Sequence, residues 1–158
     1  MEKTKLRPDF DWQSWKSTAK DLEAVDASIL KRIVFDMFLI NEFEHAVLAL
    51  NEDGCVWGPL HSSVGQEAVA AASIAALRGT DKILGTHRAH HQFLAKMMGY
   101  ALPEGWDPCR EDTPEKAVIA VRRTLAEIMG LAEGYCGGRG GSMHLRCAEA
   151  GVVGTNAI

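Results

Sequence analysis

Several features that would place the chain in a broad class of proteins are missing from its sequence. No apolar run is long enough to span a bilayer, and the first fifteen residues lack the apolar middle of a secretory signal. No cluster of Lys and Arg is long enough to follow a nucleic-acid backbone, and the net charge is −4 at pH 7. We therefore expect neither a membrane nor nucleic acid among the partners, and we expect a cytoplasmic location.

Paired cysteine spacing is also missing, which indicates free thiols in a reducing compartment at four positions: Cys55, Cys109, Cys136 and Cys147. A zinc site built from Cys136, His144 and Cys147 would lack a fourth ligand and have irregular spacing, so structural thiols are the better interpretation. What the sequence does contain, 47% hydrophobic and 24% charged residues over 158 positions, is typical of one soluble globular domain.

The chain divides into an N-terminal arm, residues 1–25, and a body, residues 26–158. Asp26 is a suitable N-cap for a long helix over about 26–50, whose apolar residues recur at helical spacing and form one face. The alanine-rich stretch 66–77 predicts a second helix. Thr-Pro-Glu at 113–115 opens another helix, because proline costs no hydrogen bond at that position.

Residues 86–91, Thr-His-Arg-Ala-His-His, form the most informative short stretch. The apolar run 82–85 leads into it and an amphipathic run leads out, which predicts a strand, a turn and a helix. Ligands bind at the carboxyl ends of strands in open α/β sheets, and helix N-terminal amides beside an arginine favour phosphate. Alternatively, the three histidines are capping and surface residues, and this stretch alone does not separate the two interpretations.

Five glycines fall within residues 134–141, which indicates unusual backbone dihedrals or a close approach to something else. The segment matches neither the Walker-type phosphate loop nor the spaced dinucleotide fingerprint. By itself, this glycine-rich loop is weak evidence for any function.

Three motifs taken together are far more specific than any one of them. They are His61 followed by Gly-Gln-Glu-Ala at 65–68, the stretch 86–90, and Gly-Gly-Ser-Met-His at 140–144. From about Phe35 to its last residue, the chain resembles the alpha-type part of the thiamine-diphosphate-dependent decarboxylating component of 2-oxo acid dehydrogenase complexes, the pyruvate, branched-chain and acetoin dehydrogenase family. Forms with fused alpha-type and beta-type parts look closest.

The resemblance implies an α/β fold, in which this chain supplies a helix-rich N-terminal portion of a thiamine-diphosphate-binding domain with the first strand or strands of a parallel sheet. Because the sequence stops at Ile158 inside an apolar segment, we expect this domain to be truncated at its C-terminus. The elements predicted above from the residues themselves, a mostly helical body with one strand, agree with this fold.

The resemblance also assigns roles to individual residues. It implies that Arg88 pairs with the diphosphate, and that His87, which replaces the usual tyrosine, supplies a titratable donor beside it. His61 is implied to lie near the 2-oxo acid and is the catalytic candidate. Segment 154–158 is implied to hold the aminopyrimidine through its backbone, where Ala157 replaces the usual glycine.

The implied activity is oxidative decarboxylation of a 2-oxo acid with acyl transfer to a lipoyl group. The implied cofactors are thiamine diphosphate and magnesium, and the implied partners are a beta-type subunit or domain, a lipoyl-bearing acyltransferase and the 2-oxo acid, in an oligomer. The magnesium ligands of the family, Gly-Asp-Gly and a later asparagine, do not occur, so we expect them beyond residue 158. The isolated chain is therefore predicted to be inactive.

Two other hypotheses compete with this one. The chain is alternatively a small metal-binding protein that uses His87, His90 and His91, although no acidic residue completes that cluster and adjacent histidines diverge on a helix. It is alternatively a non-catalytic interaction module, in which the glycine-rich loop and the N-terminal arm bind another subunit.

Overall fold

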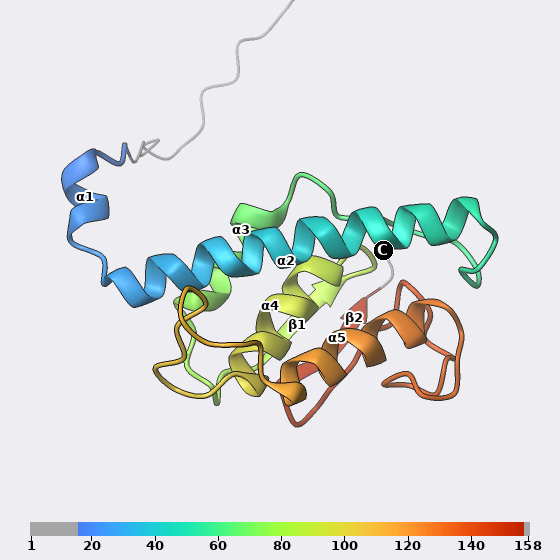
Figure 1. The fold of residues 1–158 in the computed structure, drawn as a ribbon. Helices are drawn as coiled ribbons and strands as arrows, with labels where there is room; N and C mark the ends of the chain where they lie inside the picture. The colour runs from blue at the N-terminus through green and yellow to red at the C-terminus, as the bar shows by residue number, and fades with distance from the viewer. Residues whose placement is uncertain (1–15, 157–158) are drawn as a thin grey trace, which may run out of the picture.

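The structure is a computed structural model that describes residues 16–156. Residues 1–15 of the predicted arm and Ala157 lie outside the described residues. The elements follow one another as α1 (Ala19–Glu23), α2 (Ala27–Glu52), α3 (Glu67–Ala75), β1 (Ile83–Thr86), α4 (His90–Ala101), α5 (Glu115–Ile128) and β2 (Val152–Asn156). The predicted α/β class, helix-rich with parallel strands, is confirmed (Figure 1).

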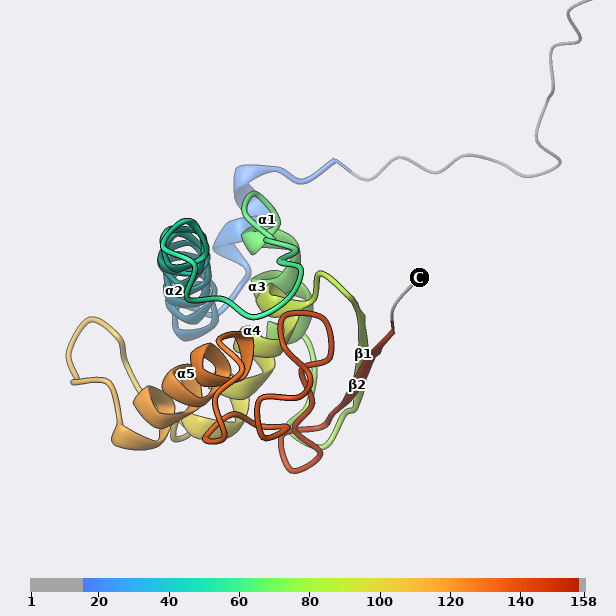
Figure 2. The same cartoon turned by 90° about the vertical axis from the view of Figure 1, so that its right-hand side faces the viewer.

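The two strands pair in parallel, with Ile83 opposite Val152 and Thr86 opposite Asn156, and the register shifts between Ile83 and Leu84. Figure 2 shows the sheet at one side of the molecule, α2 and α5 at the opposite side, and α3 and α4 between them. Helix α4 contacts α2, α3 and α5. It is therefore the central helix, and nine of its twelve residues are buried.

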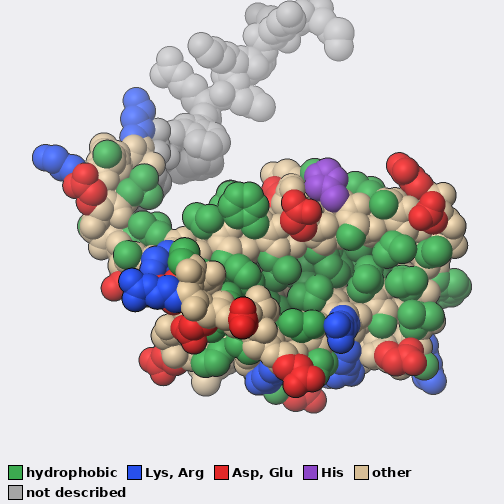
Figure 3. Space-filling view, viewed as in Figure 1, with side chains coloured by type: hydrophobic (Ala, Val, Ile, Leu, Met, Phe, Trp, Pro, Cys, Tyr) green, Lys and Arg blue, Asp and Glu red, His purple; other side chains and the backbone are tan. Residues whose placement is uncertain are grey.

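Helix α2 begins where the sequence predicts, because the Asp26 carboxylate accepts the backbone N–H of Ser28 at 2.7 Å. Its inward face carries Ile40, Phe43 and Val47, all of them buried. The expectation of one apolar face packed in the core is wrong for part of the helix, since Phe38 is 68% exposed. Figure 3 shows hydrophobic side chains gathered over α2 and along the surface beside it.

The other predicted elements are found with shorter bounds. Helix α3 lies inside the predicted stretch 66–77, and α5 begins directly after Pro114. The strand, turn and helix predicted around residues 86–91 are β1, the turn 87–89 and α4. Among the described residues, no helix has the length and apolar character needed to cross a bilayer.

Candidate functional site

The turn between β1 and α4 carries His87 and Arg88 to the carboxyl end of the strand, where the loop before α3 meets it. The rings of His61 and His87 lie edge to face with centroids 4.6 Å apart. The Arg88 guanidinium donates a hydrogen bond to the backbone carbonyl of Ser62. The structure thus brings together three predicted site residues that are 27 positions apart in sequence (61 to 88), while Ala157 lies outside the described residues.

The turn is shaped by its own sequence. The Thr86 hydroxyl accepts the backbone N–H of Arg88 at 3.3 Å, which is a local side-chain turn. A Cβ at Gly85 would lie 2.4 Å from the Cβ of Ala89, so no larger residue fits where the strand passes the start of α4. Glycine at 85 is therefore required for the close approach of β1 to the helix.

A buried hydrogen-bonded chain lies beneath this surface cluster. The Nδ1 atom of His90 is 2.8 Å from the Glu44 carboxylate, and its Nε2 atom is 2.8 Å from the Ser142 hydroxyl. The Ser142 hydroxyl also accepts the backbone N–H of His61 at 3.2 Å. The Glu44 carboxylate accepts two further bonds at 2.9 Å, from the backbone N–H and the hydroxyl of Ser63. This Glu44–His90–Ser142 network therefore holds the backbone of the loop that carries His61.

Both ring nitrogens of His90 face acceptors, since Nε2 also lies 3.0 Å from the carbonyl oxygen of Ser142. Because the Ser142 hydroxyl can donate or accept, each ring nitrogen of His90 has a hydrogen-bond partner. Burial alone would raise the pKa of Glu44, but the hydrogen bond and charge of His90, with the bonds from the 62–63 loop, lower it. Glu44 and His90 thus form a buried pair whose polar atoms are satisfied by hydrogen bonds.

The interpretation of all three histidines as surface or capping residues is wrong, since His90 is fully buried and His91 is 4% exposed. Among the described residues, no three His, Cys, Asp or Glu side chains lie close enough together to hold a metal ion, which also contradicts the metal site at His87, His90 and His91. His90 is unsuited to bind a metal because both of its ring nitrogens are already engaged. Periodicity could not reveal this, as Glu44 lies 46 residues earlier, on α2.

The Arg88 guanidinium supplies positive charge at the surface of the site. Partial burial, followed by the charges of His87, Arg88 and His90, lowers the pKa of His61. The Nδ1 atom of His87 is buried and has no hydrogen-bond partner within the described part of the chain. The Arg88 guanidinium beside a buried ring nitrogen without a partner is suited to an incoming anion.

The glycine-rich loop is wrapped around a carboxylate that sequence reasoning missed. Glu127, fully buried at the end of α5, accepts the backbone N–H groups of Cys136, Gly138 and Gly140 at 2.6, 3.0 and 2.6 Å. Successive N–H groups pointing into one concavity form an anion-binding nest, and here the anion is the chain's own side chain. Because Ser142 follows two residues later, this nest fixes the segment that supplies the network under His61.

No family model matches the sequence. Curated proteins do match it. The chain is 34% identical over 122 residues to the alpha subunit of acetoin:2,6-dichlorophenolindophenol oxidoreductase from Bacillus subtilis, an alignment that covers 77% of this chain and 30% of that protein. It is 32% identical over 129 residues to the mitochondrial pyruvate dehydrogenase E1 component subunit alpha of Chaetomium thermophilum, covering 82% of this chain and 26% of that protein.

The corresponding alpha subunit of Saccharomyces cerevisiae is 31% identical over 153 residues, which are 96% of this chain and 31% of the yeast protein. Across the relatives, the alignments span between 21% and 34% of their length. These relatives come from different organisms and belong to the same family that the three motifs indicate. The chain is thus a homologue of the alpha subunits of pyruvate dehydrogenase E1 components and acetoin oxidoreductases.

Proposed function

We propose that the chain supplies the diphosphate-binding and substrate-facing part of a 2-oxo acid dehydrogenase decarboxylating component. The observation that carries the proposal is the convergence of His61, His87 and Arg88 at the carboxyl end of β1. The whole activity would be oxidative decarboxylation of a 2-oxo acid, with transfer of the acyl unit to a lipoyl group on an acyltransferase partner.

The residues present fit the diphosphate of thiamine diphosphate. Arg88 uses one guanidinium nitrogen on Ser62 and keeps further N–H groups for an anion, and His87 has a buried ring nitrogen without a partner in the described structure. Both stand at the N-terminus of α4, whose free amides favour phosphate. When bound, the cofactor supplies the electron sink that decarboxylation of a 2-oxo acid needs.

His61 is the proposed contact for the 2-oxo acid. Because its pKa is lowered, its ring is neutral at pH 7 and offers one donor and one acceptor. The Ser142 hydroxyl holds its backbone in place at 3.2 Å. Ala157 stays the predicted backbone contact of the aminopyrimidine, and the magnesium ligands stay predicted beyond residue 158.

The proposed partners are a beta-type subunit or domain and the lipoyl-bearing acyltransferase, within an oligomer. The names of the relatives support a multi-subunit assembly, since each is an alpha subunit. The exposed apolar side chains of α2, such as Val34 and Phe38, support a face that contacts another chain. Several relatives are named as mitochondrial or chloroplastic, so a cytoplasmic location stays a prediction.

The test is the affinity for thiamine diphosphate of the complete enzyme that contains this chain. We expect Arg88→Ala to weaken binding about tenfold or more, because a charge-assisted hydrogen bond contributes roughly 1.5–3 kcal/mol. The matched control is Arg78→Ala, which removes a largely exposed arginine paired with Asp81. Equal affinities of the two variants would refute the placement of the diphosphate at Arg88.

A further inference from the structure

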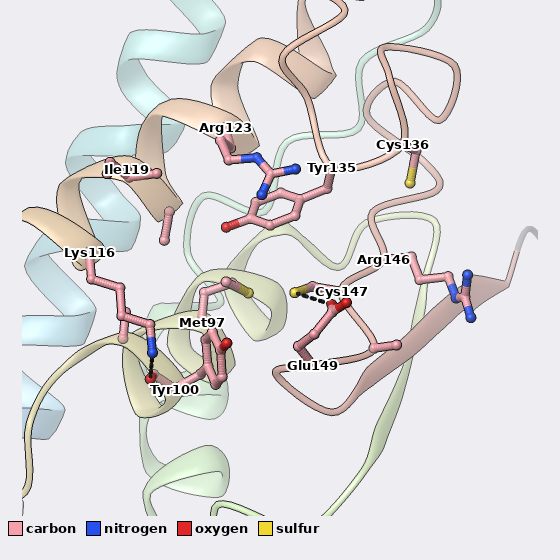
Figure 4. Close-up of a pocket in the computed structure, with 13 residues that line it drawn as sticks. Met97, Tyr100, Lys116, Ile119, Arg123, Tyr135, Cys136, Arg146, Cys147 and Glu149 are labelled. Atoms are coloured by element: carbon pink, nitrogen blue, oxygen red, sulfur yellow. Dashed lines mark hydrogen bonds between the residues drawn. The ribbon is translucent and has the colours of Figure 1, made fainter.

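A cavity of about 580 Å³ lies at the other end of α4 from His90, between α4, α5 and the segment 135–149 (Figure 4). Its wall includes Met97, Tyr100, Lys116, Ile119, Arg123, Tyr135 and Glu149. The helical rise places Tyr100 about 15 Å along α4 from His90. The three sequence motifs assign no role to this cavity.

Two cations of α5 face the cavity, and both are held in place. The Lys116 ammonium donates to the backbone carbonyl of Tyr100 at 2.9 Å and lies 3.7 Å from the centre of that ring. The Arg123 guanidinium donates through Nε to the carbonyl of Glu133 at 3.3 Å and lies 4.3 Å from the centre of the Tyr135 ring. Each contact uses part of the donor capacity, so N–H groups on both side chains remain for a ligand.

The spacing of these donors suits a small molecule. Lys116 and Arg123 are seven residues apart, which is about two helical turns or 10 Å along α5, with Ile119 between them on the same side. The Tyr135 hydroxyl points into the same space in Figure 4. Burial raises the pKa of Tyr135 to about 12, so this hydroxyl stays protonated and can donate.

Charge in the wall favours an anion. Lys116 and Arg123 carry two positive charges against the one carboxylate of Glu149, which leaves a net charge of +1 (two minus one). The Arg146 guanidinium points away from the cavity in Figure 4 and donates to the carbonyl of Val153 at 3.2 Å. Glu149 is drawn toward the Cys147 thiol at 3.5 Å, on the wall opposite α5. A ligand head group at Arg123 would therefore lie on the positive side of the cavity.

We propose that this cavity binds a small organic anion, whose carboxylate or phosphate head is held by Arg123, Lys116 and the Tyr135 hydroxyl. Its apolar body lies against Met97 and Ile119. The guanidinium fork matches either head group with two parallel hydrogen bonds. The volume falls in the range of about 300–1,000 Å³ that small-molecule sites occupy.

The test is calorimetric binding to the full 158-residue chain with three probes, phenyl phosphate, benzoate and inorganic phosphate. We expect saturable binding of phenyl phosphate or benzoate, tighter than that of inorganic phosphate, and the tighter organic probe identifies the head group. Arg123→Gln should weaken it about tenfold, because a hydrogen bond to a charged group is lost. Tyr135→Phe, which keeps the ring, should weaken it less.

The matched control is Arg122→Gln, which removes the same charge from the neighbouring position of α5, outside the cavity wall. It should change the affinity for the organic probe by less than about twofold, since salt screens a charge that does not contact the ligand. Equal losses in Arg122→Gln and Arg123→Gln, or no saturable binding of either organic probe, would overturn the proposal. Neither thiamine diphosphate nor a 2-oxo acid enters this experiment, so its outcome is independent of the proposed function.

Discussion

Replacing Glu127 by glutamine tests whether the buried carboxylate organises the glycine-rich loop. In the structure, one carboxylate oxygen accepts the N–H groups of Cys136 and Gly138, and the other accepts that of Gly140. Glutamine keeps the shape but has one oxygen and one amide NH₂. If the oxygen stays with Cys136 and Gly138, the NH₂ group faces the N–H of Gly140, and that part-buried donor loses its acceptor.

The magnitude follows from these three bonds. Charge-assisted bonds of about 1.5–3 kcal/mol become neutral bonds of about 0.5–1.5 kcal/mol, and the orphaned N–H costs about 1–3 kcal/mol more. Relief from burying a carboxylate offsets part of the loss. We therefore expect Glu127→Gln to lower the free energy of unfolding by about 2–4 kcal/mol, which is a fall in Tm of roughly 5–15 °C for a chain of this size.

The assay is urea unfolding followed by circular dichroism, together with amide hydrogen exchange at residues 136, 138 and 140. The exchange of these three amides should accelerate more than that of amides in the middle of α4. Glu133→Gln is the matched control, because Glu133 is exposed and a surface change of this kind stays within about 0.5 kcal/mol. If Glu127→Gln were as stable as Glu133→Gln, or if the three amides exchanged as in the parent, the reasoning would be refuted.

Two further changes probe other parts of the fold. Burial outweighs the contact with Arg32 and raises the pKa of Asp36 to about 6, so the Asp36 carboxylate reduces stability as the pH rises from about 4 to about 6. Asp36→Asn should therefore raise the free energy of unfolding by about 2–3 kcal/mol at pH 8 and change it little at pH 4. Urea titrations that give the same difference between variant and parent at both pH values would contradict this prediction. Gly138→Ala should lower Tm more than Gly137→Ala in thermal unfolding. Both positions have positive φ, but only the Cβ at 138 would meet neighbouring backbone, at 2.4 Å, and equal losses would disprove that contact.

Local signals in the sequence determined much of the secondary structure. The Asp26 cap, the apolar period after it and Pro114 correctly predicted where α2 and α5 begin. The order of β1, turn and α4 followed from the run of apolar, basic and amphipathic residues around 86–91. These predictions succeeded because caps, turns and periodicity depend on residues a few positions apart. The family resemblance likewise came from short motifs, each made of residues that are neighbours in the sequence.

Only the tertiary structure decided which histidines share which environment. His87 and His90 lie three residues apart, yet the first faces the surface site and the second pairs with Glu44 inside the core. The sequence likewise did not predict that Glu127 accepts hydrogen bonds from the glycine-rich loop, since its three partners lie beyond the end of its own helix. A buried polar group must find a hydrogen-bond partner, but the sequence does not say which distant segment supplies it, because that choice is made by packing.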